Sequence, residues 1–253
     1  MPATEREEVD TVRPLELAAL VRRAIATLAD PVKAPAMQAY MKSAMPYRGV
    51  SSVPMTALCR RIFDANVLPD EDSWQEAIRA LWDGAEFREE RYAAIALARH
   101  RRYREHQQPQ TLGLYQHLIW TGAWWDHVDE VATHLVRGLL VRHRSTLTPE
   151  LRTWAVADDL WVRRSAIICQ VGLRADVDQD LLRDAIDANL DGSTRGTPAL
   201  SPYGRDFFIR KAIGWALRDH ARTAPDWVRD FVTARSESLS GLSQREALKR
   251  LQP

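Results

Sequence analysis

Apolar residues recur at every third or fourth position through most of this 253-residue chain. The spacing is clearest in the segments LELAALVRRAIATLA, WQEAIRALWD, RYAAIALARH, VDEVATHLVRGLLVRH, LRTWAVADDLWVRRSAIICQVG, DLLRDAIDANL and FFIRKAIGWALRDHA. It places apolar side chains on one face of an α-helix, whereas a half-buried strand would alternate apolar and polar residues. No stretch alternates in that way, so the sequence predicts an all-α protein.

A basic residue followed by alanine and a bulky aliphatic residue forms a pattern that returns along the chain. Its basic positions are Arg91, Arg164, Lys211 and Arg245. The first gap is about twice the later ones, which suits helical repeats with a period of about 40 residues. Repeats of this length are typical of HEAT-type helix pairs that stack into an α-solenoid. We therefore expect a single HEAT-like domain over residues 1–253, made of stacked antiparallel helix pairs, with N-terminal helices at about 14–65.

Residues 191–206, with the sequence DGSTRGTPALSPYGRD, interrupt the helical pattern. They carry three glycines and two prolines between two strongly periodic segments. A long irregular connection inside a helical array is either a functional loop or a flexible insertion. The sequence leaves both interpretations open.

Charge is balanced over the chain as a whole but is unevenly distributed. There are 35 Lys plus Arg against 34 Asp plus Glu, a net charge of +1, which by itself argues for no polyanionic partner. Residues 64–90 are rich in acids, whereas residues 161–174 contain three arginines and no acid. Residues 203–222 contain five basic residues against two acids. One part of the surface is thus predicted to be acidic and another basic, and a basic face can bind phosphates.

Other sequence features bear on cellular location and on cofactors. Cys59 and Cys169 each lie inside an apolar helical pattern, which favours two buried free thiols over a disulfide and fits a reducing compartment. The polar N-terminus is not expected to act as a signal peptide, and no apolar run approaches the ~18 residues of a membrane span. The seven histidines show no metal-ligand spacing. We expect a cytoplasmic protein without membrane contact, metal or cofactor.

The segment TGAWWDHVDEV, residues 121–131, places two adjacent tryptophans beside two aspartates. If a helix begins near Trp124, Asp126 is a natural N-cap and Asp129 completes an arrangement close to a capping box. On the same helix Trp125 and Asp129 are four residues apart, so an indole and a carboxylate share one face. Spacing alone leaves a chemical role open but favours the cap.

Three segments taken together closely resemble the AlkD-type DNA alkylation-repair glycosylases, in order and in separation. They are WWDHVD at 124–129, WVRRSAIICQ at 161–170 and FFIRKAIGWALRDHA at 207–221. Residues 39–62 and REALKRL near the C-terminus are similar to the first and last helices of that family, so the resemblance covers about residues 35–251. It implies a HEAT-like solenoid whose concave basic groove holds duplex DNA. It also implies hydrolysis of the N-glycosidic bond of cationic purines alkylated at N3 or N7.

The resemblance assigns roles to individual residues. It places the tryptophan and the aspartate of the lesion site at Trp125 and Asp129, and a second tryptophan at Trp215. The implied DNA contacts are Arg164, which would bind phosphate, Arg218 and Tyr40, to which the basic run adds Lys211. Trp124 is expected in the core, and the role of Arg163 is left open.

The chemistry of the lesion fits this set of residues. A purine alkylated at N3 or N7 already carries positive charge, so it can leave as a neutral base without a general acid. One carboxylate can then suffice, in contrast to the two of ordinary glycoside hydrolysis. Asp129 would stabilise the charge that moves onto the sugar, and indole faces attract cations, so Trp125 and Trp215 can flank the damaged nucleotide. The resemblance further implies that the base is not flipped, unlike in most glycosylases.

These features predict a monomeric, monofunctional hydrolase of base excision repair. The irregular stretch 191–206 is longer than the turn expected in the family and precedes the Trp215 segment, so the lesion range, small methyl or bulky adducts, is open. The alternative is a non-catalytic HEAT-like DNA-binding or scaffolding protein. Such a scaffold would have no need of a carboxylate that faces phosphates.

Overall fold

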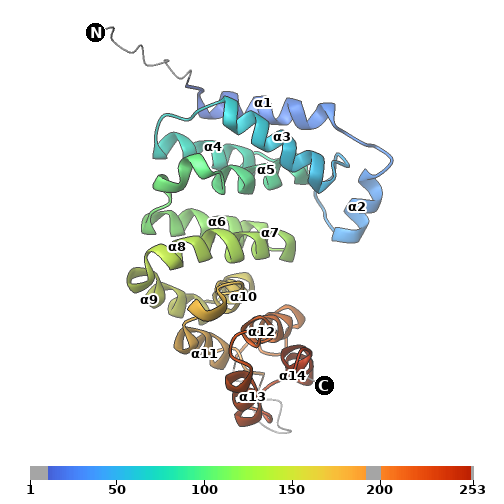
Figure 1. The fold of residues 1–253 in the computed structure, drawn as a ribbon. Coiled ribbons are helices and arrows are strands. Elements are labelled where there is room, and N and C mark those ends of the chain that lie inside the picture. Colours follow the sequence, from blue (N-terminus) through green and yellow to red (C-terminus); the bar gives the residue numbers. More distant parts are fainter. Residues whose placement is uncertain (1–10, 192–200, 252–253) are drawn as a thin grey trace, which may run out of the picture. The chain divides into compact units, whose positions relative to one another are not determined.

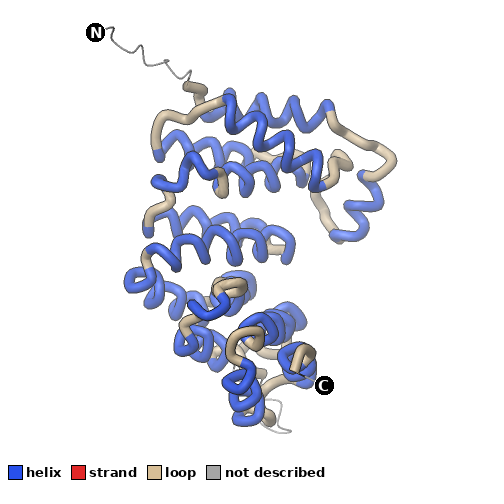
Figure 2. The backbone as a smooth tube through the Cα atoms, in the orientation of Figure 1, coloured by secondary structure: helices blue, strands red, loops and turns tan. Residues whose placement is uncertain are grey.

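The computed structural model describes residues 11–191 and 201–251, and these are helical almost throughout (Figure 1, Figure 2). Within these two ranges the only extended pairing is an isolated bridge between Thr11 and Val67. The all-α class predicted from apolar periodicity is therefore confirmed. Contacts divide the chain into two compact units, residues 1–107 and 108–253. The expectation of a single domain stays a prediction.

The first unit is built from five α-helices and a 3-10 turn in its described part. They are α1 (Pro14–Thr27), α2 (Ala34–Met41), α3 (Ser52–Ala65), α4 (Glu71–Asp83), α5 (Arg88–Ala98) and the turn η1 (Arg101–His106). Helices α1, α3, α4 and α5 pack on one another around large side chains that include Phe63, Trp74 and Trp82. Helix α2 lies beside this group (Figure 1) and buries only Met41. Most of the surface of α2 is thus left exposed.

A buried carboxylate fixes the turn between α2 and α3. Glu89, in the first turn of α5, is fully buried and accepts hydrogen bonds from the backbone N–H groups of Arg48, Gly49 and Val50 at 3.1, 2.8 and 3.0 Å. Gly49 has a φ of +86°, and a Cβ there would lie 2.1 Å from the carbonyl oxygen of Asp30. A buried charge is costly unless it is hydrogen-bonded, so Glu89 and this turn require each other.

The second unit contains nine α-helices in its described part, joined by short 3-10 and π-helical segments. The elements are η2 (Pro109–Thr111), α6 (Leu112–Gly122), α7 (Trp125–Glu130), η3 (Val131–Val136), α8 (Arg137–Arg142), α9 (Arg144–Ala155), α10 (Leu160–Ile168), η4 (Arg174–Asp176), α11 (Gln179–Asp187), α12 (Phe207–His220), α13 (Pro225–Ala234) and α14 (Gly241–Leu248). Segments α7, η3 and α8 follow one another without a break, and α12 packs on both α13 and α14.

Helix α10 is the centre of the second unit. It packs against α6, α7, α9, α11 and α12, and every residue from 161 to 170 is buried. A helix that is buried all round is normally apolar all round, yet α10 carries Arg163 and Arg164. Buried cations must be hydrogen-bonded or paired. The surrounding helices therefore have to supply partners for both guanidinium groups.

Arg163 finds its partners at the ends of three segments. It donates to the carbonyl oxygen of Val156 at 3.0 Å, to Oδ1 of Asn189 at 3.2 Å and to Oγ of Ser201 at 3.2 Å. These contacts bind the C-terminal part of the irregular stretch 191–206 to the ends of α9 and α11. Residues 192–200 of that stretch lie outside the described ranges, so its role stays open. Arg163, whose role the sequence left open, is thus part of the internal hydrogen-bond network.

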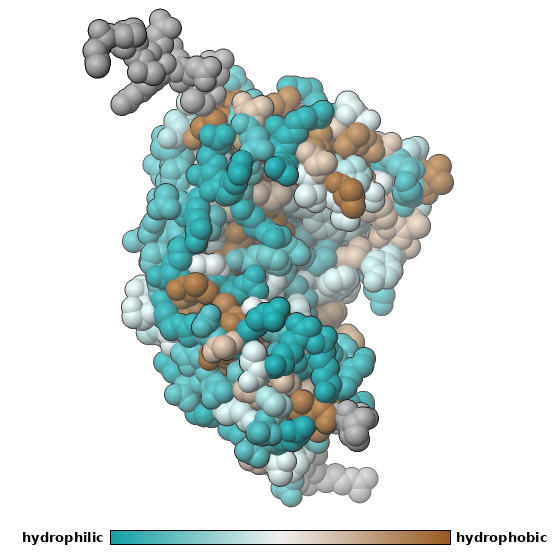
Figure 3. Space-filling model, viewed as in Figure 1, coloured by the Kyte–Doolittle hydropathy of each residue, from teal (hydrophilic) through white to brown (hydrophobic). Residues whose placement is uncertain are grey.

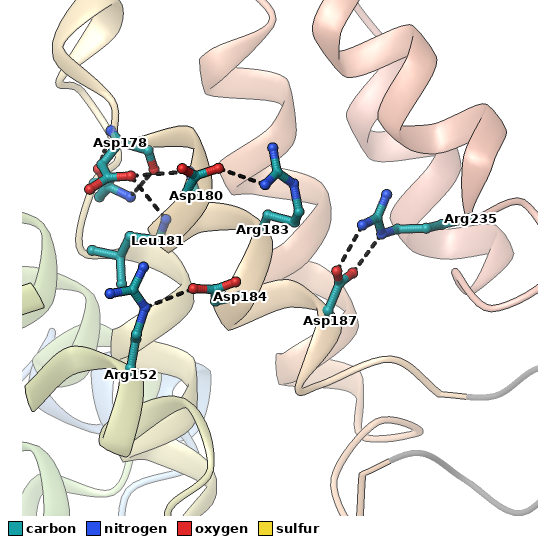
Figure 4. Close-up of polar contacts among 9 residues, drawn as sticks. Arg152, Asp178, Asp180, Leu181, Arg183, Asp184, Asp187 and Arg235 are labelled. Carbon is teal, nitrogen blue, oxygen red and sulfur yellow. Dashed lines mark hydrogen bonds and ion pairs between the residues drawn. The ribbon is translucent and has the colours of Figure 1, made fainter. Parts of the chain in front are cut away.

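Ion pairs hold α11 between its neighbours (Figure 4). Arg152 on α9 donates from Nε to Asp184 at 2.7 Å. Arg235, directly after α13, binds both oxygens of Asp187 at 2.5 and 2.7 Å. Exposed single pairs contribute little to stability, whereas bidentate arginine–carboxylate pairs are stronger and more specific in geometry. The Asp187–Arg235 pair is therefore expected to contribute more to stability than the Arg152–Asp184 pair.

The surface is largely hydrophilic, and the two cysteines are buried. Hydrophilic residues predominate on the face drawn in Figure 3, where hydrophobic patches are small and separate. None of the described helices combines the length and the apolar character needed to cross a bilayer. Cys59 and Cys169 are free and buried as predicted, and burial raises the pKa of each thiol to about 12. Neither thiol is therefore reactive at neutral pH.

Candidate functional site

Two adjacent tryptophans take up different positions at the start of α7. Helix α6 ends with Ala123 in the left-handed region, at a φ of +38°, and Trp124 is extended, at a φ of −155°. Helix α7 begins at Trp125, so Asp126 lies in its first turn rather than at its N-cap, and no side chain caps this helix. The capping box that spacing favoured is therefore wrong. The reason is that the carboxylate of Asp129 is bound by a different helix.

Asp129 and Arg164 form a bidentate ion pair between α7 and α10. The Nε of Arg164 donates to Oδ1 at 2.8 Å, and its Nη2 donates to Oδ2 at 2.7 Å. Its Nη1 donates to the carbonyl oxygen of Phe208 in α12 at 2.6 Å. Arg164 is only 5% exposed, whereas the carboxylate side chain keeps 19% of its surface open to solvent. The pair thus joins three helices and holds a partly accessible carboxylate in one orientation.

Burial dominates the electrostatics of this carboxylate. It raises the pKa of Asp129 above the ordinary value, the hydrogen bonds from Arg164 oppose that shift, and the neighbouring charges of Asp126 and Glu130 add to it. A raised pKa reports that the anion is poorly solvated. Such an anion gains more than a hydrated one from a positive charge placed next to it. The site therefore suits a ligand on which positive charge develops.

The helix changes its winding just after Asp129. Residues 131–136, the segment η3, are π-helical, and the carbonyl oxygen of Asp129 accepts a hydrogen bond from Oγ1 of Thr133 at 2.7 Å. Single π-helical turns are rare in proteins, and those that occur often lie at functional sites. This turn begins two residues after Asp129 and leads into the regular helix α8.

An aromatic cluster supports the ion pair. The ring centroids of Trp124 and Trp161 are 6.1 Å apart, those of Trp124 and Phe208 are 5.5 Å apart, and those of Trp161 and Phe208 are 4.8 Å apart. These residues stand at the N-terminal ends of α7, α10 and α12, so the cluster fixes the three helix starts together. Trp124 thus packs against two aromatic rings, but it is half-buried rather than in the core as expected. Neither Trp161 nor Phe208 was singled out individually from the sequence, because ring contacts across helices leave no local signal.

Trp125 and Trp215 are both half-buried. Trp125 is the first residue of α7, one turn before Asp129, and Trp215 lies on α12, about two turns beyond Phe208. Within residues 11–191 and 201–251, neither indole makes a ring contact or a side-chain hydrogen bond. Both therefore offer aromatic surface to a ligand. Their roles at a lesion stay predictions.

The two basic residues predicted on α12 share one partner. Lys211 Nζ lies 3.2 Å from Oε1 of Glu246 on α14, and Arg218 pairs with the other oxygen of the same carboxylate. All three side chains are partly exposed. A DNA phosphate at Lys211 or Arg218 would have to compete with Glu246. Sequence analysis missed Glu246, because a pairing between α12 and α14 has no sequence pattern.

Tyr40 is the one predicted site residue in the first unit. It lies on α2 and is 78% exposed, so a ligand can reach it. The structure brings Asp129, Arg164 and the backbone of Phe208 into direct contact in the second unit, and it groups Lys211 with Arg218 through Glu246. Among the described residues no set of three or more His, Cys, Asp or Glu side chains is grouped closely enough to hold a metal ion.

Comparisons with known proteins place the chain. A sequence profile described as DNA alkylation repair enzyme matches residues 21–251. The chain belongs to this DNA alkylation repair enzyme family. A solved structure described as a predicted DNA alkylation repair enzyme from Enterococcus faecalis matches with a TM-score of 0.75 and 28% identity, over 88% of this chain and 96% of that chain. No curated protein matches the chain.

Membership of the DNA alkylation repair enzyme family confirms the resemblance drawn from the three segments. It implies an enzyme whose partner is DNA. The matched range extends over every predicted site residue, from Tyr40 to Arg218, and over Glu246. Membership alone does not assign the bond that is broken or the residues that break it.

Proposed function

We propose that this DNA alkylation repair enzyme is a monofunctional DNA glycosylase that hydrolyses the N-glycosidic bond of cationic alkylated purines in duplex DNA. The observation that supports this is the environment of Asp129. Its carboxylate is desolvated, is oriented by both arms of a buried guanidinium and is still partly open to solvent. An indole lies one turn before it on the same helix. This combination favours a cationic species, such as a purine alkylated at N3 or N7.

The proposed reaction takes place at the sugar. The bond between C1′ and the purine nitrogen breaks, both electrons leave with the base, and the base becomes neutral. Positive charge then develops on the deoxyribose, where Asp129 stabilises it while water adds to C1′ and gives up its proton to the carboxylate or to solvent. No general acid is needed, because the leaving base is already cationic. Trp125 and Trp215 flank the cationic nucleotide, and no base flipping is required.

Arg164 acts in this proposal mainly as a positioning residue. A guanidinium has five N–H donors, and three of its nitrogens are already engaged by Asp129 and Phe208. The remaining N–H groups leave room for the predicted phosphate contact, but the burial of Arg164 limits it. Lys211, Arg218 and Tyr40 are more exposed and are the proposed backbone contacts. We infer a monomeric cytoplasmic enzyme of base excision repair.

The test compares Asp129→Asn with Asp187→Asn, which breaks a bidentate pair of the same kind elsewhere in the second unit (Figure 4). Both changes leave an arginine without its full partner, so both should lower the melting temperature. A carboxylate ~4 Å from a cation contributes at most about 4 kcal/mol at an effective dielectric near 20. Because Arg164 cancels part of that field, we expect Asp129→Asn to slow single-turnover release of methylpurine by between about tenfold and a thousandfold.

The control and the parent protein supply the other outcomes. Asp187→Asn should stay within about threefold of the parent, since Asp187 pairs with Arg235 after α13 and not with Arg164. Equal losses in both variants would trace the effect to stability and would remove Asp129 from the mechanism. A parent protein that binds methylated duplex DNA but releases no purine would instead be the non-catalytic DNA-binding or scaffolding protein.

A further inference from the structure

The first unit contains a cavity that no predicted site residue lines. It lies between the C-terminal halves of α3 and α5 and has a volume of about 410 Å³. Its rim carries Arg60, Arg99 and Arg101, and its wall includes Phe63. Small-molecule sites have volumes of roughly 300–1,000 Å³. The space is therefore larger than a phosphate ion needs and is of the size of a nucleotide unit.

The charge at this cavity is strongly positive. Asp64 is the sole acidic residue among its lining residues, all of which lie in the described part of the chain. Its Oδ1 lies 3.3 Å from Nε2 of His100 and 3.8 Å from Nη2 of Arg101, and its Oδ2 lies 3.7 Å from Nε of Arg60. One carboxylate thus faces two arginines and a histidine, and Arg99 adds a third guanidinium group to the lining. The excess of positive charge calls for an anionic ligand.

Most of these basic residues belong to one short run of the sequence. The sequence RHRRYR, residues 99–104, supplies Arg99, Arg101, Arg102 and Arg104 directly after an acid-rich segment. Arg102 donates from Nη2 to the carbonyl oxygen of Asp64 at 3.1 Å, so this run is attached to the end of α3. Tertiary packing then adds Arg60 from α3 itself. An extended row of arginines fits the backbone of a polymer better than a compact anion.

The cavity combines a mostly buried imidazole with exposed guanidinium groups. The His100 side chain is only 10% exposed and is held by Asp64 and by edge contact with Phe63, at a centroid distance of 5.9 Å. The Arg60 and Arg101 side chains are 77% and 84% exposed. Their pairs with Asp64 are long, and exposed pairs of this kind are weak. Both guanidinium groups can therefore turn to a phosphate at little cost.

We propose that this cavity is a second DNA-binding site that holds one phosphodiester unit of a DNA strand, with Arg60 and Arg101 on the phosphate oxygens. The inference rests on the proposed function only for the identity of its ligand. The site lies wholly within the first unit and adds affinity rather than chemistry. It gives the first unit a direct part in DNA binding.

The alternative is a purely structural role, in which these arginines stabilise the C-terminal ends of α3 and α5, whose partial negative charge favours cations. The two interpretations differ in what is lost. On the helix-end interpretation, removing the arginines lowers thermal stability and leaves DNA binding alone. On the binding interpretation, removing them weakens DNA binding. It also makes the affinity less dependent on salt, because fewer phosphates are contacted.

The experiment uses the full chain and undamaged duplex DNA of fixed length. The double variant Arg60→Gln/Arg101→Gln is compared with Arg23→Gln/Arg79→Gln, which removes the same charge from exposed positions on α1 and α4. Affinity is measured by fluorescence anisotropy over a range of salt concentrations. We expect the first variant to lose about tenfold or more in affinity and to lower the salt slope by about 1, because one phosphate contact is removed. The control should lose no more than about threefold.

A variant that should raise the affinity for DNA controls for losses of affinity caused by misfolding. Asp64→Asn removes the competing carboxylate and should raise affinity for duplex DNA severalfold. Equal losses in the two arginine doubles, or an unchanged affinity in Asp64→Asn, would overturn the proposal. A deoxynucleoside monophosphate that binds in an Arg60-dependent manner, with duplex affinity unchanged in the double variant, would overturn it in favour of a free-nucleotide site.

The same variants separate this inference from the proposed function. At saturating DNA, Arg60→Gln/Arg101→Gln should release methylpurine at the parental single-turnover rate, because the cavity holds no reacting group. If the parent releases no purine, the glycosylase proposal fails while the comparison of affinities still decides the cavity. A lowered rate at saturation would show that the cavity acts on the reaction and would contradict a purely binding role.

Discussion

Asp129 loses part of its hydration to burial and regains two hydrogen bonds from Arg164. The balance leaves its pKa above the ordinary value for aspartate. A carboxylate in that state is a weakly solvated anion beside a fixed cation, and its remaining field is directed at whatever approaches its open side. The consequences can be measured through pH and through the geometry of the arginine.

The raised pKa gives opposite pH dependences for stability and activity. Because the folded-state pKa lies above that of the unfolded chain, the contribution of Asp129 to stability is present at low pH and is lost as the pH rises through the folded pKa. Excision needs the carboxylate, so the rate should fall as the pH is lowered through that same raised pKa. We expect an acid limb above the ordinary aspartate value of ~3.9. Single-turnover rates across pH, corrected for spontaneous depurination, measure it, and Asp129→Asn should lack the limb.

Arg164→Lys tests whether the guanidinium positions Asp129 or mainly binds phosphate. A lysine cannot bind both carboxylate oxygens in the fork geometry of arginine, so Asp129 should lose its fixed orientation while the positive charge remains. We expect the excision rate at saturating DNA to fall by roughly tenfold, equivalent to about 1.4 kcal/mol. Affinity for undamaged duplex DNA should change far less. A fall in affinity that equals the fall in rate would return Arg164 to the phosphate-binding role.

Among the elements, α12 and α14 approach each other closely at Gly214. A Cβ on Gly214 would lie 2.5 Å from Cβ of Glu246 and 3.2 Å from the carbonyl oxygen of Ser243. The missing side chain lets α14 lie close enough for Glu246 to reach both Lys211 and Arg218. The position of a glycine on one helix therefore determines the charge environment of the basic residues predicted to contact DNA.

Gly214→Ala should destabilise the protein although alanine is the better helix former. Helix propensity favours the change by about 1 kcal/mol, whereas overpacking costs about 1–3 kcal/mol. The matched control is Gly113→Ala on α6, where a Cβ would meet nothing within 4 Å, and this variant should be as stable as the parent or more stable. Thermal melts of the two variants give the comparison. A rise in melting temperature for Gly214→Ala would show that α14 can move away without loss.

Over the whole molecule, the net charge of +1 conceals separate clusters of opposite sign. Basic residues gather on α12 in the second unit and around the α3 and α5 ends in the first. Duplex DNA responds to such local clusters, because each phosphate that is neutralised releases condensed counterions. A nearly neutral protein can thus bind a polyanion.

Affinity for undamaged duplex DNA should therefore fall steeply with salt. If about 4 phosphates are neutralised, the slope of log affinity against log salt should be near −4, or roughly a 200-fold loss between 50 and 200 mM salt. Anisotropy titrations at several salt concentrations measure this slope. A flat response over that range would contradict binding through the phosphate backbone.

The sequence alone determined the helical class and, through three segments, the family. Helical class follows from apolar spacing, which is a local property that each segment carries by itself. The Trp125 and Asp129 pair could be found in the same way, because residues four apart on a helix are neighbours. The predicted cap at Asp126 failed because α7 already begins at Trp125, which places Asp126 in its first turn, and because Asp129 pairs with Arg164 on α10.

Only the tertiary structure decided which charges meet. The partner of Asp129 lies on α10, that of Lys211 lies on α14, and the arginines of the α3–α5 cavity come from two helices. The energy of such pairs depends on separation, burial and orientation, which are set when helices pack. A sequence specifies the charges it carries, whereas packing determines how far each charge is desolvated and which opposite charge faces it.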